Sequence, residues 1–321
     1  MLFSKIIAKK FDAVWGRYEG DPAMHYDTPA AYPGLQSQPF PIMGDKNVTL
    51  QGAFYYYGTF RPEKLIVFDH GISAGHLAYL KEIDYLAQHG YTVYSYDHTG
   101  CVATGGEGIR GFAQGVNDLD HVLTALQKDA RFAEVPRKII GHSWGGYSCM
   151  NVVAFHPEVT HVVSLAGFLS ARALSEQYIP KMFLKYSEEV MARERQRNPR
   201  YADLDARESM QQSKAHLMHV QSRDDNMVKF DLCCAPLSKA LAGRANTEFV
   251  VLDGHGHDPQ RTTAALAAYT AMETELNRKR KHHQLDTPAQ QEAFRAAQNW
   301  VQIDEQDEQV WQKILDFLAK D

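Results

Sequence analysis

A serine between glycines, Gly141-His-Ser-Trp-Gly145, directly follows an apolar stretch and precedes a helical pattern. A serine on a sharp turn between a strand and a helix is exposed and can act as a nucleophile in acyl transfer. Such a turn needs small residues on both sides, because a Cβ would collide with the neighbouring strand or helix. A purely structural turn is the alternative, so Ser143 needs partners elsewhere in the chain.

The first partner is a base, since a serine hydroxyl is a weak nucleophile until its proton is removed. The last expected strand ends in Gly254-His-Gly-His257, whose glycines allow an imidazole to point back toward the serine. We choose His257 over His255, because it follows the second glycine and opens the next segment. A metal site is disfavoured, since Pro259 stands where a metallo-hydrolase motif would need another histidine.

The second partner is a carboxylate that fixes the tautomer of the histidine and stabilises its charged form. It should follow a strand between the serine and the histidine. The segment Gln221–Val228 meets this condition with two adjacent acids. We favour Asp225, and Asp224 remains the alternative.

Negative charge that develops on a substrate oxygen requires preorganised N–H donors. We expect the backbone of Trp144 to supply one donor and the backbone of Ile72 to supply the other. Ile72 lies in the loop Asp69–Gly75, where Gly71 permits an unusual backbone. Taken alone, His70 and Gly71 could equally form an ordinary turn at the end of a strand.

Short apolar runs alternate with helical patterns over most of the chain. Strands are expected at 48–57, 64–69, 91–97, 138–141, 160–165, 215–221 and 247–252, and helices at 76–89, 112–128, after Ser143, from Phe230 and at 307–320. This alternation with short connections predicts right-handed crossovers and a mostly parallel sheet between two layers of helices.

Three parts are expected: an N-terminal amphipathic helix and arm (1–37), an α/β catalytic domain (38–167 and 213–321) and a helical insertion (168–212). In the insertion, apolar residues recur from Ile179 to Val190 at spacings of three and four, which predicts one amphipathic helix. We interpret the insertion as a lid, and a simple packing helix is the alternative. The residues expected to shape a substrate pocket are His70, Phe168, Tyr178, Met182 and Phe183.

Composition restricts the possible partners of this 321-residue chain. A formal net charge of −5 gives no broad attraction to nucleic acid or to an anionic membrane. The basic run Arg278–Lys281 ends a helical stretch, where cations are favourable without any ligand. No apolar stretch is long enough to insert stably in a membrane, and the four cysteines follow no disulfide or metal-ligand spacing. We therefore expect a cytoplasmic protein with reduced cysteines and no metal.

Taken together, His70-Gly71, Asp97-His-Thr-Gly100, Gly141–Gly145, Asp225 and Gly254–His257 resemble the α/β-hydrolase superfamily. Their order is typical of that fold. Within it, the chain is similar to bacterial monoglyceride-lipase-like and serine-aminopeptidase-like members. It lacks the His-Gly-Gly-Gly motif of hormone-sensitive-lipase-like esterases.

The resemblance implies an eight-stranded, mostly parallel sheet, a mobile lid, no cofactor and acyl transfer to water. We expect a serine hydrolase that acts on a small-molecule ester, in preference to an amide or peptide, with Ser143, His257 and Asp225 as its triad. An acyltransferase and a non-catalytic binding protein of the same fold are the alternatives. The sequence predicts no oligomeric state.

Overall fold

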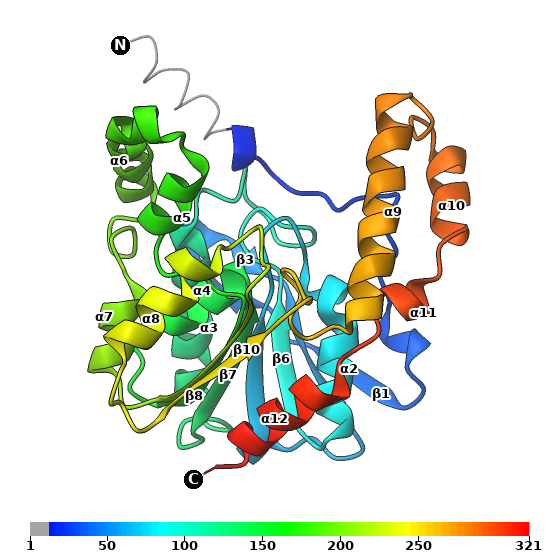
Figure 1. Ribbon diagram of the computed structural model, residues 1–321. Coiled ribbons are helices and arrows are strands. Elements are labelled where there is room, and N and C mark those ends of the chain that lie inside the picture. Colours follow the sequence, from blue (N-terminus) through cyan, green and yellow to red (C-terminus); the bar gives the residue numbers. More distant parts are fainter. Residues whose placement is uncertain (1–12, 321) are drawn as a thin grey trace.

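The computed structural model describes residues 13–320, with an eight-stranded sheet at its centre (Figure 1). The strand order is β1-β4-β6-β5-β7-β8-β9-β10, in which the pairs β1–β4 and β4–β6 are antiparallel and the others parallel. The strands are β1 (Leu35–Pro39), β4 (Gly52–Tyr57), β5 (Leu65–Asp69), β6 (Thr92–Tyr96), β7 (Arg137–His142), β8 (Val159–Leu165), β9 (His216–Ser222) and β10 (Thr247–Leu252). A separate hairpin pairs β2 (Ile42–Met43) with β3 (Thr49–Leu50).

Helices cover both faces of the sheet, which explains why every residue of β5 and β6 is buried. One face carries α3 (Ala113–Lys128), α4 (Trp144–Val152), α7 (Ala206–Gln212) and α8 (Cys234–Ala240). The other face carries α2 (Leu80–Gln88) and α12 (Glu308–Leu318). The chain therefore has the α/β-hydrolase fold expected from its sequence.

The insertion differs from its expected form, because Pro180 divides the predicted helix. The structure has α5 (Ala171–Tyr178), the 3₁₀ helix η5 (Lys181–Tyr186) and α6 (Ser187–Arg197). Proline disfavours helical backbone at the residue before it, and Ile179 is extended, with φ −87° and ψ 123°. The break leaves Met182 77% exposed, so the apolar positions do not form one buried stripe.

A second group of helices lies at the same end of the molecule as the insertion, on the opposite side (Figure 1). It consists of α9 (Thr263–Lys281), α10 (Pro288–Ala296) and α11 (Trp300–Ile303). These helices share a small core with Ala23 from the N-terminal arm. The basic run ends α9 as expected, and Arg280 there pairs with Asp21 of the arm at 2.5 Å. Arg295 also donates to the Pro22 carbonyl at 2.7 Å, so the arm is held against these helices.

Most of the expected N-terminal amphipathic helix lies outside the described residues. Between residues 13 and 320, no helix has the length and apolar character needed to cross a membrane.

Candidate active site

Ser143 lies on the turn between β7 and α4, with a strained backbone at φ 53° and ψ −109°. The close packing of this turn explains the glycines around it. A Cβ on Gly141 would lie 2.2 Å from the carbonyl carbon of Gly145, and a Cβ on Gly145 would lie 2.0 Å from the Asp69 carbonyl oxygen. The turn can form because positions 141 and 145 carry no side chain.

Three side chains from distant segments meet at this turn. The Ser143 Oγ lies 2.9 Å from Nε2 of His257, and Nδ1 of His257 lies 2.9 Å from Oδ2 of Asp225. Asp225 is buried, and the His257 side chain is 15% exposed. The structure thus brings together the three residues that the sequence predicted, in the order needed for proton transfer from the serine.

The two acids after β9 have different partners. Asp225 Oδ1 accepts hydrogen bonds from the backbone N–H groups of Met227 and Val228 at 2.8 and 2.9 Å. Nδ1 of His257 lies nearer to Oδ2, at 2.9 Å, than to Oδ1, at 3.1 Å. Asp224 instead accepts the N–H groups of Gly254 and Gly256 at 2.9 and 3.3 Å. Asp224 therefore holds the loop that carries the histidine, while Asp225 contacts the histidine itself.

The two expected oxyanion donors are the backbone N–H groups of Trp144 and Ile72. Trp144 is the first residue of α4, and Ile72 lines a cavity that also reaches His257. Among residues 13–320, neither backbone N–H has a hydrogen-bond acceptor. Both N–H groups are therefore available to a substrate oxygen.

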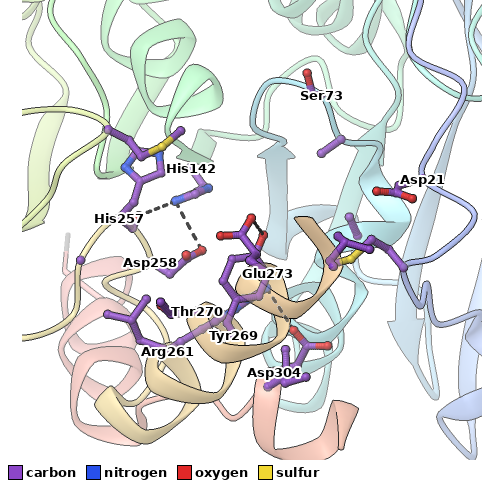
Figure 2. A pocket seen from close by; sticks show the side chains of 18 of the residues that line it. Asp21, Ser73, His142, His257, Asp258, Arg261, Tyr269, Thr270, Glu273 and Asp304 are labelled. Atoms are coloured by element: carbon purple, nitrogen blue, oxygen red, sulfur yellow. Dashed lines mark hydrogen bonds and ion pairs between the residues drawn. The ribbon is translucent and has the colours of Figure 1, made fainter. Parts of the chain in front are cut away.

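The cavity next to His257 has a volume of about 760 Å³. Its walls come from the arm (residues 18–26), the loop after β5, α9 and α11. Figure 2 shows carboxylates directed into it, among them Asp258, Glu273 and Asp304. Arg261 pairs with Asp304 at 3.1 Å, whereas the only partner of Glu273 within residues 13–320 is the hydroxyl of Tyr269, at 3.1 Å.

None of the five residues expected to shape a pocket lines this cavity. His70 is fully buried, and Phe168 is buried against the Tyr147 ring at 4.5 Å. Tyr178 and Met182 are 60% and 77% exposed, and Phe183 is partly buried in η5. The walls of this cavity come instead from the N-terminal arm and from helices that follow the histidine, so a pocket shaped by those five residues stays a prediction.

A buried charged cluster lies beneath the site, in the Asp97–Gly100 segment. His98 lies between Asp69, at 2.6 Å, and Asp118, at 3.2 Å, and its ring lies 4.5 Å from that of Trp144. Burial alone would lower the pKa of His98, but these two carboxylates raise it to about 9. The cluster therefore holds a buried cation next to the turn that carries Ser143.

Sequence reasoning missed two residues that contact the site, Tyr79 and His142. The Tyr79 hydroxyl lies 2.8 Å from Nδ1 of His142, and Nε2 of His142 lies 2.8 Å from the backbone oxygen of His257. The position of His142 beside Ser143 in the sequence was the available signal for its contact with the site.

Within residues 13–320, no three His, Cys, Asp or Glu side chains are grouped to hold a metal ion.

Comparisons with known proteins identify a family for this chain. Residues 61–240 match the family model described as "Serine aminopeptidase, S33". The comparison with curated proteins finds no match. The cavity walls that come from the arm, α9 and α11 lie outside the matched residues.

Solved structures share the fold at low sequence identity. An esterase from Pyrococcus furiosus aligns with a TM-score of 0.57 and 17% identity, over 74% of this chain and 89% of that chain. Acetyl xylan esterase 1 from a Thermoanaerobacterium species aligns with a TM-score of 0.53 and 17% identity, over 80% and 91%. An alpha/beta hydrolase from a Penicillium species aligns with a TM-score of 0.54 and 17% identity, over 77% and 97%.

Proposed function

Because the chain belongs to the serine aminopeptidase S33 family of α/β hydrolases, we propose that it cleaves a carboxylic ester through an acyl-enzyme on Ser143. One observation carries this proposal. The hydroxyl of Ser143, the imidazole of His257 and the carboxylate of Asp225 form a continuous set of contacts, at 2.9 Å each.

In the proposed reaction, Ser143 Oγ attacks the ester carbonyl carbon while Nε2 of His257 takes the hydroxyl proton. The same proton then goes to the leaving alcohol as the ester bond breaks. Water attacks the acyl-enzyme in a second cycle, again with His257 as base, and releases the acid. Asp225 holds the proton on Nδ1 of His257, so that Nε2 faces the serine as an acceptor.

The oxyanion of each tetrahedral intermediate would be bound by the N–H groups of Ile72 and Trp144. Their support is that Trp144 directly follows Ser143, that Ile72 lines the cavity next to His257, and that neither N–H has another acceptor among the described residues. A preorganised donor of this kind contributes about 10²–10³-fold to the rate.

Cleavage of an amide is the second candidate, because the matched family is described as an aminopeptidase and the cavity is acidic. The carboxylate of Glu273, which has no cationic partner among the described residues, would attract a free amine on a substrate. Esters remain the primary proposal, since two structural neighbours are esterases and an ester has the better leaving group.

We propose that the insertion 168–212 acts as a lid. Its support is a set of contacts between α5 and the loop that carries Asp225. Gln177 Nε2 and the Tyr178 hydroxyl both donate to the Met227 carbonyl, at 2.9 and 2.8 Å. Movement of α5 would therefore displace Met227, which lies two residues from Asp225.

The cytoplasmic location also remains a proposal, supported by four buried, unpaired cysteines.

Turnover of a series of p-nitrophenyl esters with increasing acyl length, with Ser143→Ala as the control, tests the function. The wild-type protein should release p-nitrophenol, and the variant should lose the activity. Equal activity in the variant would refute the mechanism.

A fluorophosphonate probe separates an enzyme from a non-catalytic binding protein, because only an activated Ser143 should be labelled. Added alcohol or amine acceptors test the acyltransferase alternative through the products that form. A matched aminoacyl amide series tests the second candidate.

A further inference from the structure

Side chains bind the peptide groups on both sides of Gly71. Nδ1 of His70 lies 2.7 Å from the Gly71 carbonyl oxygen, and the Gly71 N–H donates to the Tyr79 hydroxyl at 3.2 Å. A Cβ on Gly71 would lie 2.6 Å from that hydroxyl, so the close contact requires glycine.

The partners of His70 fix its tautomer. The backbone N–H of His98 donates to Nε2 of His70 at 3.0 Å, so Nε2 must be unprotonated. The proton of the neutral ring is therefore on Nδ1, where it is donated to the Gly71 carbonyl. Burial, reinforced by the nearby His98 charge, lowers the pKa of His70 to about 3, which keeps the ring neutral.

This bond determines the direction of the Ile72 N–H. The Gly71 carbonyl and the Ile72 N–H belong to one peptide group, and in a trans peptide they point in opposite directions. All described peptide bonds are trans. A carbonyl drawn toward the buried His70 therefore directs the Ile72 N–H the other way, toward the cavity that Ile72 lines.

Tyr79 binds the preceding peptide group, between His70 and Gly71, and connects it to the rest of the site. The His257 carbonyl can only accept, so Nε2 of His142 carries a proton, and burial lowers the pKa of His142 to about 4. Nδ1 of the neutral ring then accepts from Tyr79. A directed chain of hydrogen bonds thus runs from the Gly71 N–H through Tyr79 and His142 to the loop that carries His257.

We propose that His70, Tyr79 and His142 are positioning residues. His70 orients the Gly71–Ile72 peptide group so that the Ile72 N–H faces the substrate oxygen, and Tyr79 and His142 fix the place of Gly71 relative to His257. This inference rests on the proposed function, because it assigns these residues to the oxyanion site of that reaction. Within residues 13–320, none of the three is hydrogen-bonded to the Ser143 hydroxyl or to the His257 imidazole, although Tyr79 and His142 line the cavity.

The test compares two substitutions that keep different halves of the His70 ring. In His70→Asn, the amide nitrogen can take the place of Nδ1 and donate to the Gly71 carbonyl. In His70→Gln, the amide oxygen can replace Nε2, and the bond to Gly71 is lost. His161→Gln, at a buried histidine on β8, is the matched control.

We expect kcat for p-nitrophenyl acetate to fall about 10–100-fold in His70→Gln and to stay within about threefold in His70→Asn and the control. KM should change by less than about threefold, since the donor acts mainly on the transition state. Equal losses in the Asn and Gln variants, an unchanged kcat in His70→Gln, or a loss confined to KM would overturn the inference.

Tyr79→Phe removes a single oxygen and provides a second test if His70→Gln does not fold. It should lower kcat at least tenfold with a cooperative thermal transition retained, and an unchanged kcat would overturn the proposal. Labelling of Ser143 by a fluorophosphonate gives a readout without ester turnover. A wild-type protein that labels but cleaves no ester refutes the proposed function, while the order of labelling rates among the variants still decides the inference. A wild-type protein that does neither refutes both.

Discussion

Replacing Asp225 by asparagine would leave the shape of the triad intact and reverse one hydrogen bond. The Oδ1 position accepts two backbone N–H groups, from Met227 and Val228. An amide nitrogen there would face both donors, so it must occupy the Oδ2 position, 2.9 Å from Nδ1 of His257. The new amide then donates to Nδ1, and the imidazole proton moves to Nε2.

This tautomer cannot take the proton of Ser143, because Nε2 already carries one. The expected loss of kcat is about 10⁴-fold, the order found when an asparagine replaces the acid in a serine hydrolase triad. The substitution also removes a buried charge that is well hydrogen-bonded, so the thermal transition should shift by only a few degrees.

Asp224→Asn is the matched control, since it changes the same charge at the neighbouring residue. Its contacts are with the backbone of Gly254 and Gly256, so kcat should fall by less than about tenfold and stability should carry most of the effect. The assay is kcat at saturating p-nitrophenyl ester, with ¹⁵N spectra of His257 to read the tautomer. Similar kcat losses in the two variants, or a larger loss in Asp224→Asn, would refute the assignment of Asp225.

Other substitutions test the packing and charge of the site. Gly145→Ala should lower the free energy of unfolding by about 3 kcal/mol in urea titrations, because its Cβ would meet the Asp69 carbonyl, and Gly105→Ala, in open space, should have no such effect. Burial raises the pKa of Glu194 from 4.5 to about 7. This group therefore stabilises the fold below pH 4.5, and its contribution is lost as the pH rises to 7. Glu194→Gln should reduce the fall in unfolding free energy between pH 5 and 8. Arg280→Ala should release the arm and raise KM for large esters with little change in kcat for the acetate, and unchanged KM across the ester series would count against a role for the arm.

The sequence predicted most of the sheet and the three side chains that meet at the turn after β7, because those features depend on local patterns. It did not predict β1, most of which lies in the segment expected as an arm. An apolar run followed by Gly-x-Ser-x-Gly leaves few backbone solutions, and buried strands such as β5 and β7 were found within one or two residues of their true bounds. The helix break at Pro180 also has a local signal, the proline itself. The periodicity of the apolar residues on both sides of it nevertheless predicts one continuous helix.

The cavity could not be predicted in the same way. Its walls combine the arm with α9 and α11, which are more than 200 positions apart in the chain and meet only through tertiary contacts such as Asp21–Arg280. The roles of Tyr79 and His142 likewise depend on which atoms face one another after folding. Periodicity and motif spacing contain no information on such contacts.

The arm has a consequence for engineering. Residues 18–26 close the cavity but supply none of the reacting groups, and they are fastened to α9 and α10 by side chains that can be changed one at a time. Chimeras that exchange this segment, together with its anchor points, would alter which molecules are accepted and leave bond cleavage untouched. In the proposed reaction, the choice of substrate and the cleavage of the bond would thus depend on separate segments of the chain.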